Sequence, residues 1–296
     1  MAAGWGSISS GCGPSWSERD GALATTLKLR PAPAGGWPPV EAGALRPDRI
    51  ASLPRHEVER LPLVAGNRVV ALADLFEVGG DGTDDVVVEG DLASFALVGA
   101  GMSRGRLGVH GAVGARAGSE MSGGSLMIEG DAGPYAGQGM TGGLLDVGGA
   151  AGDHLAAPLP GARNGMNRGT VLVRGHAGQL AGMRMRRGMI VIGGEAGPGA
   201  GCGMLAGTIV VIGRLGPGAG ALMRRGTILT LGPAEILPVF LDTGARRVPF
   251  LNLYFRQIES TGIAVPGEAW HAVYRRRVGD ISDLGKGEIL TLERPA

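Results

Sequence analysis

Apolar and polar residues alternate in a five-residue segment that recurs every 19 residues through the middle of the chain. The second and fourth residues of the segment are apolar, as in Leu107/Val109 and Ile190/Ile192. Alternate residues of a β-strand face the same side, so the pattern predicts a short strand with one apolar face. We expect each strand to pair in parallel and in register with the equivalent strand of the next repeat.

Methionine and glycine follow the same period. Successive methionines are 19 residues apart, except for one interval of 26, and a glycine follows each methionine by three residues. The long interval predicts a seven-residue insertion within residues 155–165. The methionines are Met102, Met121, Met140, Met166, Met185, Met204 and Met223, and the glycines are Gly105, Gly124, Gly143, Gly169, Gly188, Gly207 and Gly226.

These repeats predict a mostly β fold: a single-stranded right-handed parallel β-helix of about seven 19-residue coils, flanked by mixed segments. The hand follows from the strong preference of parallel crossovers for right-handedness. Glycines at the corners provide positive φ or close approach. The expected parts are a disordered tail (1–21), an N-terminal mixed segment or cap (22–83), the Gly-rich β-helix (84–232) and a C-terminal helix and strand segment (233–296).

The later repeats also carry an apolar residue at the outward third position of the strand. An apolar row on the outer face of a sheet needs a cover, either from the C-terminal segment or from a partner subunit. The segment after Pro249 has the spacing of an amphipathic helix, and a closing strand is expected at residues 288–292. The outward row is Leu172, Val191, Val210 and Leu229, and the apolar residues of the helix are Phe250, Leu251, Tyr254, Phe255 and Ile258.

Composition narrows the functional classes. The 296 residues include 57 glycines and carry a formal net charge of +1, which argues against non-specific nucleic-acid binding. Only Cys12 and Cys202 are present, too few for a cysteine-rich metal site. The sequence has no apolar stretch of membrane-spanning length, and Met1–Gly21 lacks the order of a signal peptide, so we expect a cytoplasmic protein with no membrane contact.

Candidate catalytic chemistry is sparse. The five histidines form no HxH or HExxH spacing, and we expect no catalytic residue, metal site or bound cofactor in this chain. The methionine column could hold a soft metal or fill a corner with flexible apolar side chains. The second interpretation is favoured because neither cysteine nor histidine recurs with the methionines.

Arginines gather beside the methionine corner. Stacked one coil apart, they would form a basic ridge on one edge of the β-helix. The ridge could be a solvated edge that prevents aggregation, or it could contact an anionic partner through bidentate carboxylate pairing. Its expected members are Arg104, Arg168, Arg184, Arg186, Arg187, Arg224 and Arg225.

The spaced glycines resemble the GXGXG β-helix domain shared by the large subunit of glutamate synthase and by the C subunit of formylmethanofuran dehydrogenase. The flanking segments favour the second: residues 61–67 (LPLVAGN) with 72–78 (LADLFEV), and residues 277–292 (RVGDISDLGKGEILTL), look like its beginning and end. The resemblance covers about residues 25–294.

The resemblance implies a structural subunit of a one-carbon enzyme complex. In the bacterial formyltransferase/hydrolase branch, the complex transfers formyl from formyl-tetrahydromethanopterin to methylofuran and hydrolyses it to formate. The partners would be the other subunits, with the polyglutamyl tail of methylofuran as a candidate ligand of the arginines. The alternatives are the C subunit of a molybdenum or tungsten formylmethanofuran dehydrogenase, an independent β-helix binding module, or a glutamate-synthase-like GXGXG domain.

Overall fold

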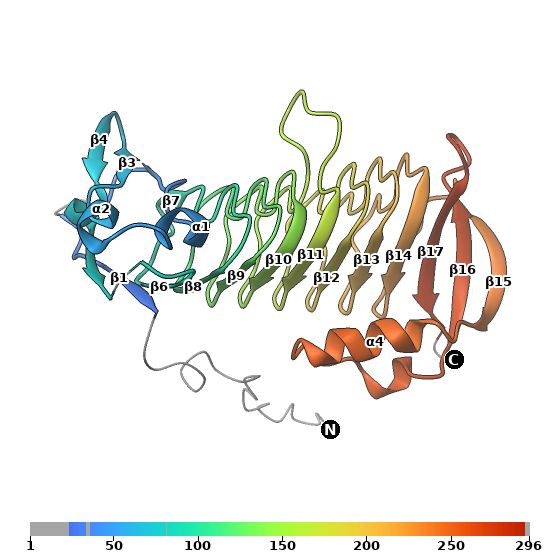
Figure 1. The fold of residues 1–296 in the computed structure, drawn as a ribbon. Coiled ribbons are helices and arrows are strands. Elements are labelled where there is room, and N and C mark those ends of the chain that lie inside the picture. The colour runs from blue at the N-terminus through green and yellow to red at the C-terminus, as the bar shows by residue number, and fades with distance from the viewer. Residues whose placement is uncertain (1–23, 34–35, 81, 294–296) are drawn as a thin grey trace, which may run out of the picture.

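A long, largely parallel β-sheet dominates the computed structural model (Figure 1), which describes residues 24–33, 36–80 and 82–293. The expected tail at residues 1–21 lies outside the described residues. The 13 strands of the main sheet follow the order β15-β16-β17-β14-β13-β12-β11-β10-β9-β8-β6-β1-β5. The fold is therefore mostly β and consistent with a β-helix.

The repeated segments form the central strands, each hydrogen-bonded in parallel to the next. Val171 of β11 lies opposite Ile190, which lies opposite Ile209, which in turn lies opposite Ile228. All four side chains are fully buried, which confirms the expected register and apolar inner face. The strands are β6 (Asp85–Glu89), β8 (Arg106–His110), β9 (Ser125–Ile128), β10 (Thr141–Val147), β11 (Arg168–Val173), β12 (Met189–Ile192), β13 (Thr208–Val211) and β14 (Arg225–Thr230).

A second line of parallel contacts runs beside the main sheet. After each strand the chain turns and makes a single β-bridge to the next repeat, mostly through small residues. These side chains are largely buried, so the interior between the two lines is narrow. The bridged residues are Leu92, Val113, Ala132, Ala151, Ala177, Ala196, Leu215 and Ala234.

The N-terminal segment covers the first strand of the stack. Strand β1 (Thr25–Leu29) pairs in parallel with β6 and antiparallel with β5 (Phe76–Gly79). A four-stranded sheet in the order β4-β3-β2-β7 packs nearby, and Phe76 meets Phe95 edge to face at 5.7 Å between ring centroids. The remaining elements are β2 (Val40–Glu41), α1 (Pro47–Ile50), α2 (Arg55–Val58), β3 (Pro62–Ala65), β4 (Arg68–Ala71), α3 (Leu72–Leu75) and β7 (Phe95–Ala96).

The C-terminal strands extend the sheet at the other end. Strand β17 (Lys286–Leu292) pairs in parallel with β14, which confirms the closing strand expected at residues 288–292. Strand β16 (Val273–Gly279) then pairs antiparallel with β17, and β15 (Leu241–Arg247) pairs antiparallel with β16. Every residue of β15 is exposed, so this last strand projects into solvent.

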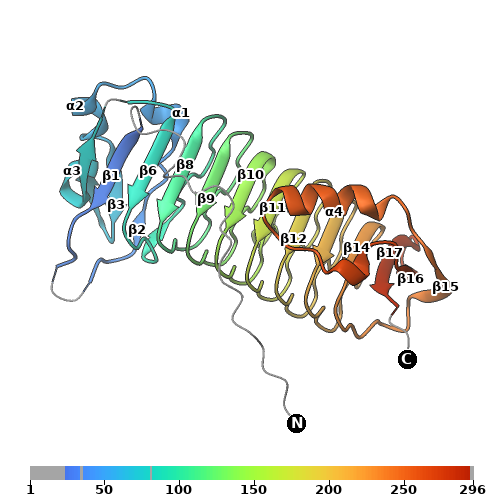
Figure 2. The ribbon, with the colours of Figure 1, turned by 90° about the horizontal axis from the view of Figure 1, so that it is seen from below.

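Helix α4 (Leu251–Ser260) covers the outer face of the later strands, followed by a short 3₁₀ helix at Gly267–Ala269 (Figure 2). Leu251, Phe255 and Ile258 are buried on its inner side at the spacing of one helical face. They share a core cluster with the outward row of the sheet. The expected cover is thus confirmed, and it comes from the chain itself. The outward residues in that cluster are Leu172, Val191, Val210, Leu229 and Leu290.

Candidate functional site

The seven methionines lie at equivalent corners and are all fully buried. The carbonyl oxygen of each of the first six accepts a hydrogen bond from the residue after the next methionine, as in Arg186 N–H to Met166 (2.8 Å) and Arg224 N–H to Met204 (2.8 Å). These bonds place the methionines one above another. For the last, Met223, the donor is the N–H of Asp280 at 3.3 Å, so a C-terminal residue takes the place of a further repeat.

Four of the glycines that follow a methionine by three residues make room for the methionine of the preceding repeat: Gly124, Gly188, Gly207 and Gly226. A Cβ on Gly226 would lie 2.7 Å from Cε of Met204, and one on Gly207 would lie 2.9 Å from Cε of Met185. All seven glycines also have positive φ, which side chains disfavour. Methionine and glycine at this spacing are therefore complementary in shape, which is typical of a packed core.

Most of the expected arginines lie on the edge where strands β11 to β14 begin. Arg168, Arg186, Arg187 and Arg225 are exposed, and within the part of the chain that the structure describes they form no ion pair. The other two are engaged: Arg224 binds Asp283 at 2.8 Å, and Arg184 donates to the carbonyl oxygen of Ala162 at 3.4 Å.

The arginines do not form one uninterrupted row, because one of the later repeats lacks them. Leu205 occupies the position that Arg186 and Arg224 occupy in their repeats, because the backbone N–H of each of the three donates to the carbonyl oxygen of the methionine one repeat earlier. The next residue in that repeat is Ala206, which stands where Arg187 and Arg225 stand in theirs. The arginines therefore form two groups: Arg168, Arg184, Arg186 and Arg187 in one, Arg224 and Arg225 in the other. Arg104 lies several repeats away.

The expected insertion projects from this same edge as a loop between β10 and β11 (Figure 1). Residues 160–164 are exposed. The base of the loop is fixed by the hydrogen bond from the N–H of Gly165 to the carbonyl oxygen of Arg184 at 3.1 Å. The Arg184 side chain holds the loop a second time through Ala162. The insertion thus stands beside the first group of arginines.

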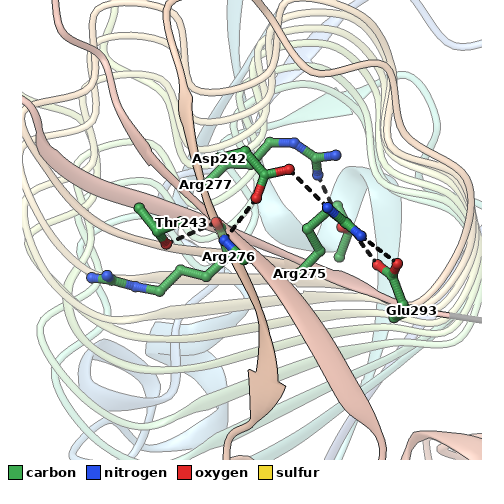
Figure 3. A network of polar contacts seen from close by, with 8 residues as sticks. Asp242, Thr243, Arg275, Arg276, Arg277 and Glu293 are labelled. Carbon is green, nitrogen blue, oxygen red and sulfur yellow. Dashed lines mark hydrogen bonds and ion pairs between the residues drawn. The ribbon is translucent and has the colours of Figure 1, made fainter.

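A network of charged side chains locks the three C-terminal strands together (Figure 3). Arg275 on β16 donates to both carboxylate oxygens of Glu293 (2.9 and 2.7 Å) and to Asp242 of β15 (3.0 Å). Beside it, Arg276 binds Glu288 of β17 at 2.7 Å. The hydrogen bonds from Arg275 lower the pKa of Glu293, and those from Gly244 N–H and Arg275 lower the pKa of Asp242. This network was not predicted from the sequence, although three consecutive arginines at 275–277 indicate it.

A second ion pair ties helix α4 to the sheet. Arg174 binds Asp146 at 2.8 Å and donates to the carbonyl oxygen of Thr261, just after the helix, at 3.1 Å. Burial raises the pKa of the Asp146 carboxyl, and the charge of Arg174 only partly offsets that effect. The pair therefore positions the end of α4.

The polar groups commonly used in catalysis are dispersed. His110 pairs with Glu129 at 2.8 Å, His154 stacks on Tyr135 at 4.7 Å, and His176 accepts a hydrogen bond from the N–H of Glu195. Burial raises the pKa of the half-buried Cys202 thiol, which opposes thiolate formation. Among the described residues, no cluster of three or more histidine, cysteine or acidic side chains could hold a metal ion, and no helix could cross a membrane.

No protein-family model matches the chain. A solved structure does: one chain of the formyltransferase/hydrolase complex from Methylorubrum extorquens, determined with methylofuran, superposes with a TM-score of 0.83 at 39% identity. The match covers 91% of this chain and 100% of that one.

Two curated relatives match over shorter segments. The C subunit of the formyltransferase/hydrolase complex of Methylorubrum extorquens is 40% identical over 93 residues. The C subunit of the tungsten-containing formylmethanofuran dehydrogenase 2 of Methanothermobacter thermautotrophicus is 33% identical over 80 residues. The matched segments span 34% and 30% of those relatives' lengths.

The fold and the dispersed polar groups define a β-helix-like subunit with a packed interior. The chain belongs to the family formed by the C subunits of formyltransferase/hydrolase complexes and formylmethanofuran dehydrogenases.

Proposed function

We propose that this chain is a scaffold subunit of a formyltransferase/hydrolase complex. That complex would transfer formyl from formyl-tetrahydromethanopterin to methylofuran and hydrolyse it to formate, with the chemistry on other subunits. The observation that carries the proposal is the full-length match, at 39% identity, to a chain of such a complex solved with methylofuran. The packed interior supports a structural role, because the seven methionines are fully buried and fill the corner between successive repeats.

Co-expression with the other three subunits tests this proposal. The tagged chain should purify with them as one assembly that releases formate from formyl-tetrahydromethanopterin, while the chain alone shows no turnover. A monodisperse chain that binds no other subunit, or that turns over substrate alone, would contradict the scaffold role. Metal analysis of the assembly distinguishes this function from that of a formylmethanofuran dehydrogenase, which predicts stoichiometric molybdenum or tungsten in the assembly.

We infer that the arginines on the edge that carries the insertion contact an anionic partner, and the polyglutamyl tail of methylofuran is the ligand that the family suggests. Four of them are exposed and lack an acidic partner within the described residues, which supports this contact. The test replaces these four arginines with glutamine: Arg168, Arg186, Arg187 and Arg225. A control with the same change in charge replaces four exposed arginines elsewhere: Arg49, Arg60, Arg68 and Arg256.

Binding of an oligo-γ-glutamate and retention of the other subunits are then measured for both variants. The first variant should weaken one of the two interactions, with reduced dependence on salt, whereas the control should match the wild type. If the first variant also matches the wild type in both measurements, the arginines form a solvated edge only.

The finer architecture is also a proposal: about seven right-handed coils between residues 84 and 232, with caps at 22–83 and 233–296, in a cytoplasmic protein. The 19-residue spacing and the two lines of parallel contacts support it. Deletion of one complete unit, residues 186–204, should leave a folded protein, because each remaining strand can still pair in register with the strand of the next repeat. Deletion of half a unit should prevent folding, since it turns apolar residues to the outside.

A further inference from the structure

Exposed apolar side chains concentrate at the C-terminal end of the sheet. Nine large apolar side chains are exposed in the described residues, and four of them surround the turn that joins β16 to β17. This turn projects beyond the sheet on the edge that also carries the insertion (Figure 1). We call the four residues the terminal patch: Leu222 (58% exposed), Leu241 (55%), Ile281 (53%) and Leu284 (46%).

Asp280 brings the members of the terminal patch together. Its buried carboxylate accepts a hydrogen bond from the N–H of Leu222 at 2.9 Å, and the next residue, Ile281, donates to the carbonyl oxygen of Val239 at 3.1 Å. Leu241 lies on β15 directly opposite Val278, close to the start of the turn. The patch is therefore a fixed surface built from three segments of the chain.

The backbone at Leu222 is unfavourable for its side chain. Its φ is 59°, in the left-handed region that leucine rarely adopts. The equivalent corner positions of other repeats share this backbone conformation, at Gly101, Gly139 and Gly203 (φ 63–70°) and also at Glu120 (φ 59°) and Arg184 (φ 50°). The corner thus imposes a left-handed backbone on several residue types, and what distinguishes Leu222 among them is a large apolar side chain exposed to solvent. An exposed apolar side chain on a fixed backbone is a candidate contact for another chain.

The charges next to the patch are unfavourable as well. Arg225 on β14 lies directly opposite Lys286 on β17, and both are exposed. Like charges at facing positions destabilise a sheet. The nearby acids are engaged elsewhere: Asp283 binds Arg224, and Asp280 is held by Ser282 and Leu222. Arg225 and Lys286 thus present uncompensated positive charge beside an apolar surface.

We propose that the terminal patch is a docking site for another subunit of the complex, one that presents an apolar side chain flanked by carboxylates. An apolar centre with a charged rim is the usual arrangement of a protein interface, and the charges here require an acidic partner. A second copy of this chain fits poorly, because a two-fold contact would place Arg225 and Lys286 against the same cations. The inference rests on the proposed function, since it needs a hetero-oligomeric complex.

The test compares variants in the co-expressed complex. Leu222→Gly removes the apolar side chain and relieves the backbone, so the full chain should melt at the same or a higher temperature. Ile281→Ser removes a second side chain. The control is Leu253→Ser on the outer side of α4, where the side chain is 68% exposed and outside the patch. Affinity is measured by mass photometry of the diluted complex, and each subunit is quantified by mass spectrometry.

Both patch variants should weaken retention of one particular subunit by about tenfold or more, and the control should match the wild type. Arg225→Gln with Lys286→Gln should reduce the salt dependence of the same interaction. If both patch variants retain all subunits like the wild type, the docking site is refuted while the scaffold role stands. If the wild type itself retains none, the scaffold role fails first. A dimer of the chain alone that requires Leu222 would also overturn the proposal.

Discussion

Replacing Phe255 with alanine tests how strongly helix α4 stabilises the sheet. Phe255 is fully buried, belongs to the outer core cluster and meets Trp270 edge to face at 5.6 Å. A phenylalanine of this kind buries about 150–200 Å², which at about 25 cal/mol per Å² corresponds to about 4–5 kcal/mol. Alanine retains part of this area but leaves a cavity, so the free energy of unfolding should fall by about 3–5 kcal/mol.

The matched control is Leu253→Ala on the opposite side of the same helix, where the side chain is 68% exposed. It should change the free energy of unfolding by less than about 0.5 kcal/mol. Both variants are measured by urea denaturation in dilute solution, followed by tryptophan fluorescence, with binding of a hydrophobic dye as a second readout. The Phe255 variant should also bind more dye, because loosening α4 exposes the apolar row. A loss below about 1 kcal/mol, with unchanged dye binding, would show that α4 does not protect this face.

Three further changes test other parts of the fold. Burial alone would raise the pKa of Asp280, but its hydrogen bonds lower the pKa, so stability that depends on the ionised carboxylate should be lost as the pH falls below about 4. Melting temperatures measured from pH 7 to pH 2 should therefore fall more steeply for the wild type than for Asp280→Asn. Parallel curves for the two proteins would contradict this. Gly226→Ala should cost about 1–3 kcal/mol more than Gly244→Ala, although both glycines have positive φ. Only at Gly226 would the Cβ lie 2.9 Å from a backbone atom, the carbonyl oxygen of Gly207, besides 2.7 Å from Cε of Met204. Equal costs in urea denaturation would show that the backbone conformation alone matters. Tyr274→Phe should lower the free energy of unfolding by about 1–2 kcal/mol in the same assay, because the buried hydroxyl donates to the backbone carbonyl oxygen of Ala269 at 2.6 Å. An unchanged free energy would mean that this carbonyl oxygen finds another donor.

The sequence predicted those features that depend on a repeated local pattern. The inward pairs such as Ile209 and Val211 follow from alternation alone, and α4 could be placed because Phe255 and Ile258 have the spacing of one helical face. The outward row, exemplified by Val191, required a cover, and the helix supplied it. Local periodicity and burial agree in these elements.

Features that depend on contacts outside the repeat could not be predicted. Strand β15 has no apolar face, and it pairs antiparallel with β16 through backbone hydrogen bonds and the ion pair between Arg275 and Asp242. The end of the stack at Asp280 likewise depends on a single carboxylate that replaces a missing repeat. The interruption of the arginines could have been seen, because Leu205 stands in the sequence at the position of Arg186 and Arg224.

The position of β17 has a consequence for biosynthesis. The partner of β14 is formed by Lys286–Leu292, close to the end of the described chain, and not by the segment that follows β14 directly. While the ribosome is still translating residues 231–285, the edge of β14 is therefore an open template with unpaired N–H and carbonyl groups. Stop codons that fall between residues 233 and 285 should accordingly yield aggregating products, even though every glycine-rich repeat would already have been made.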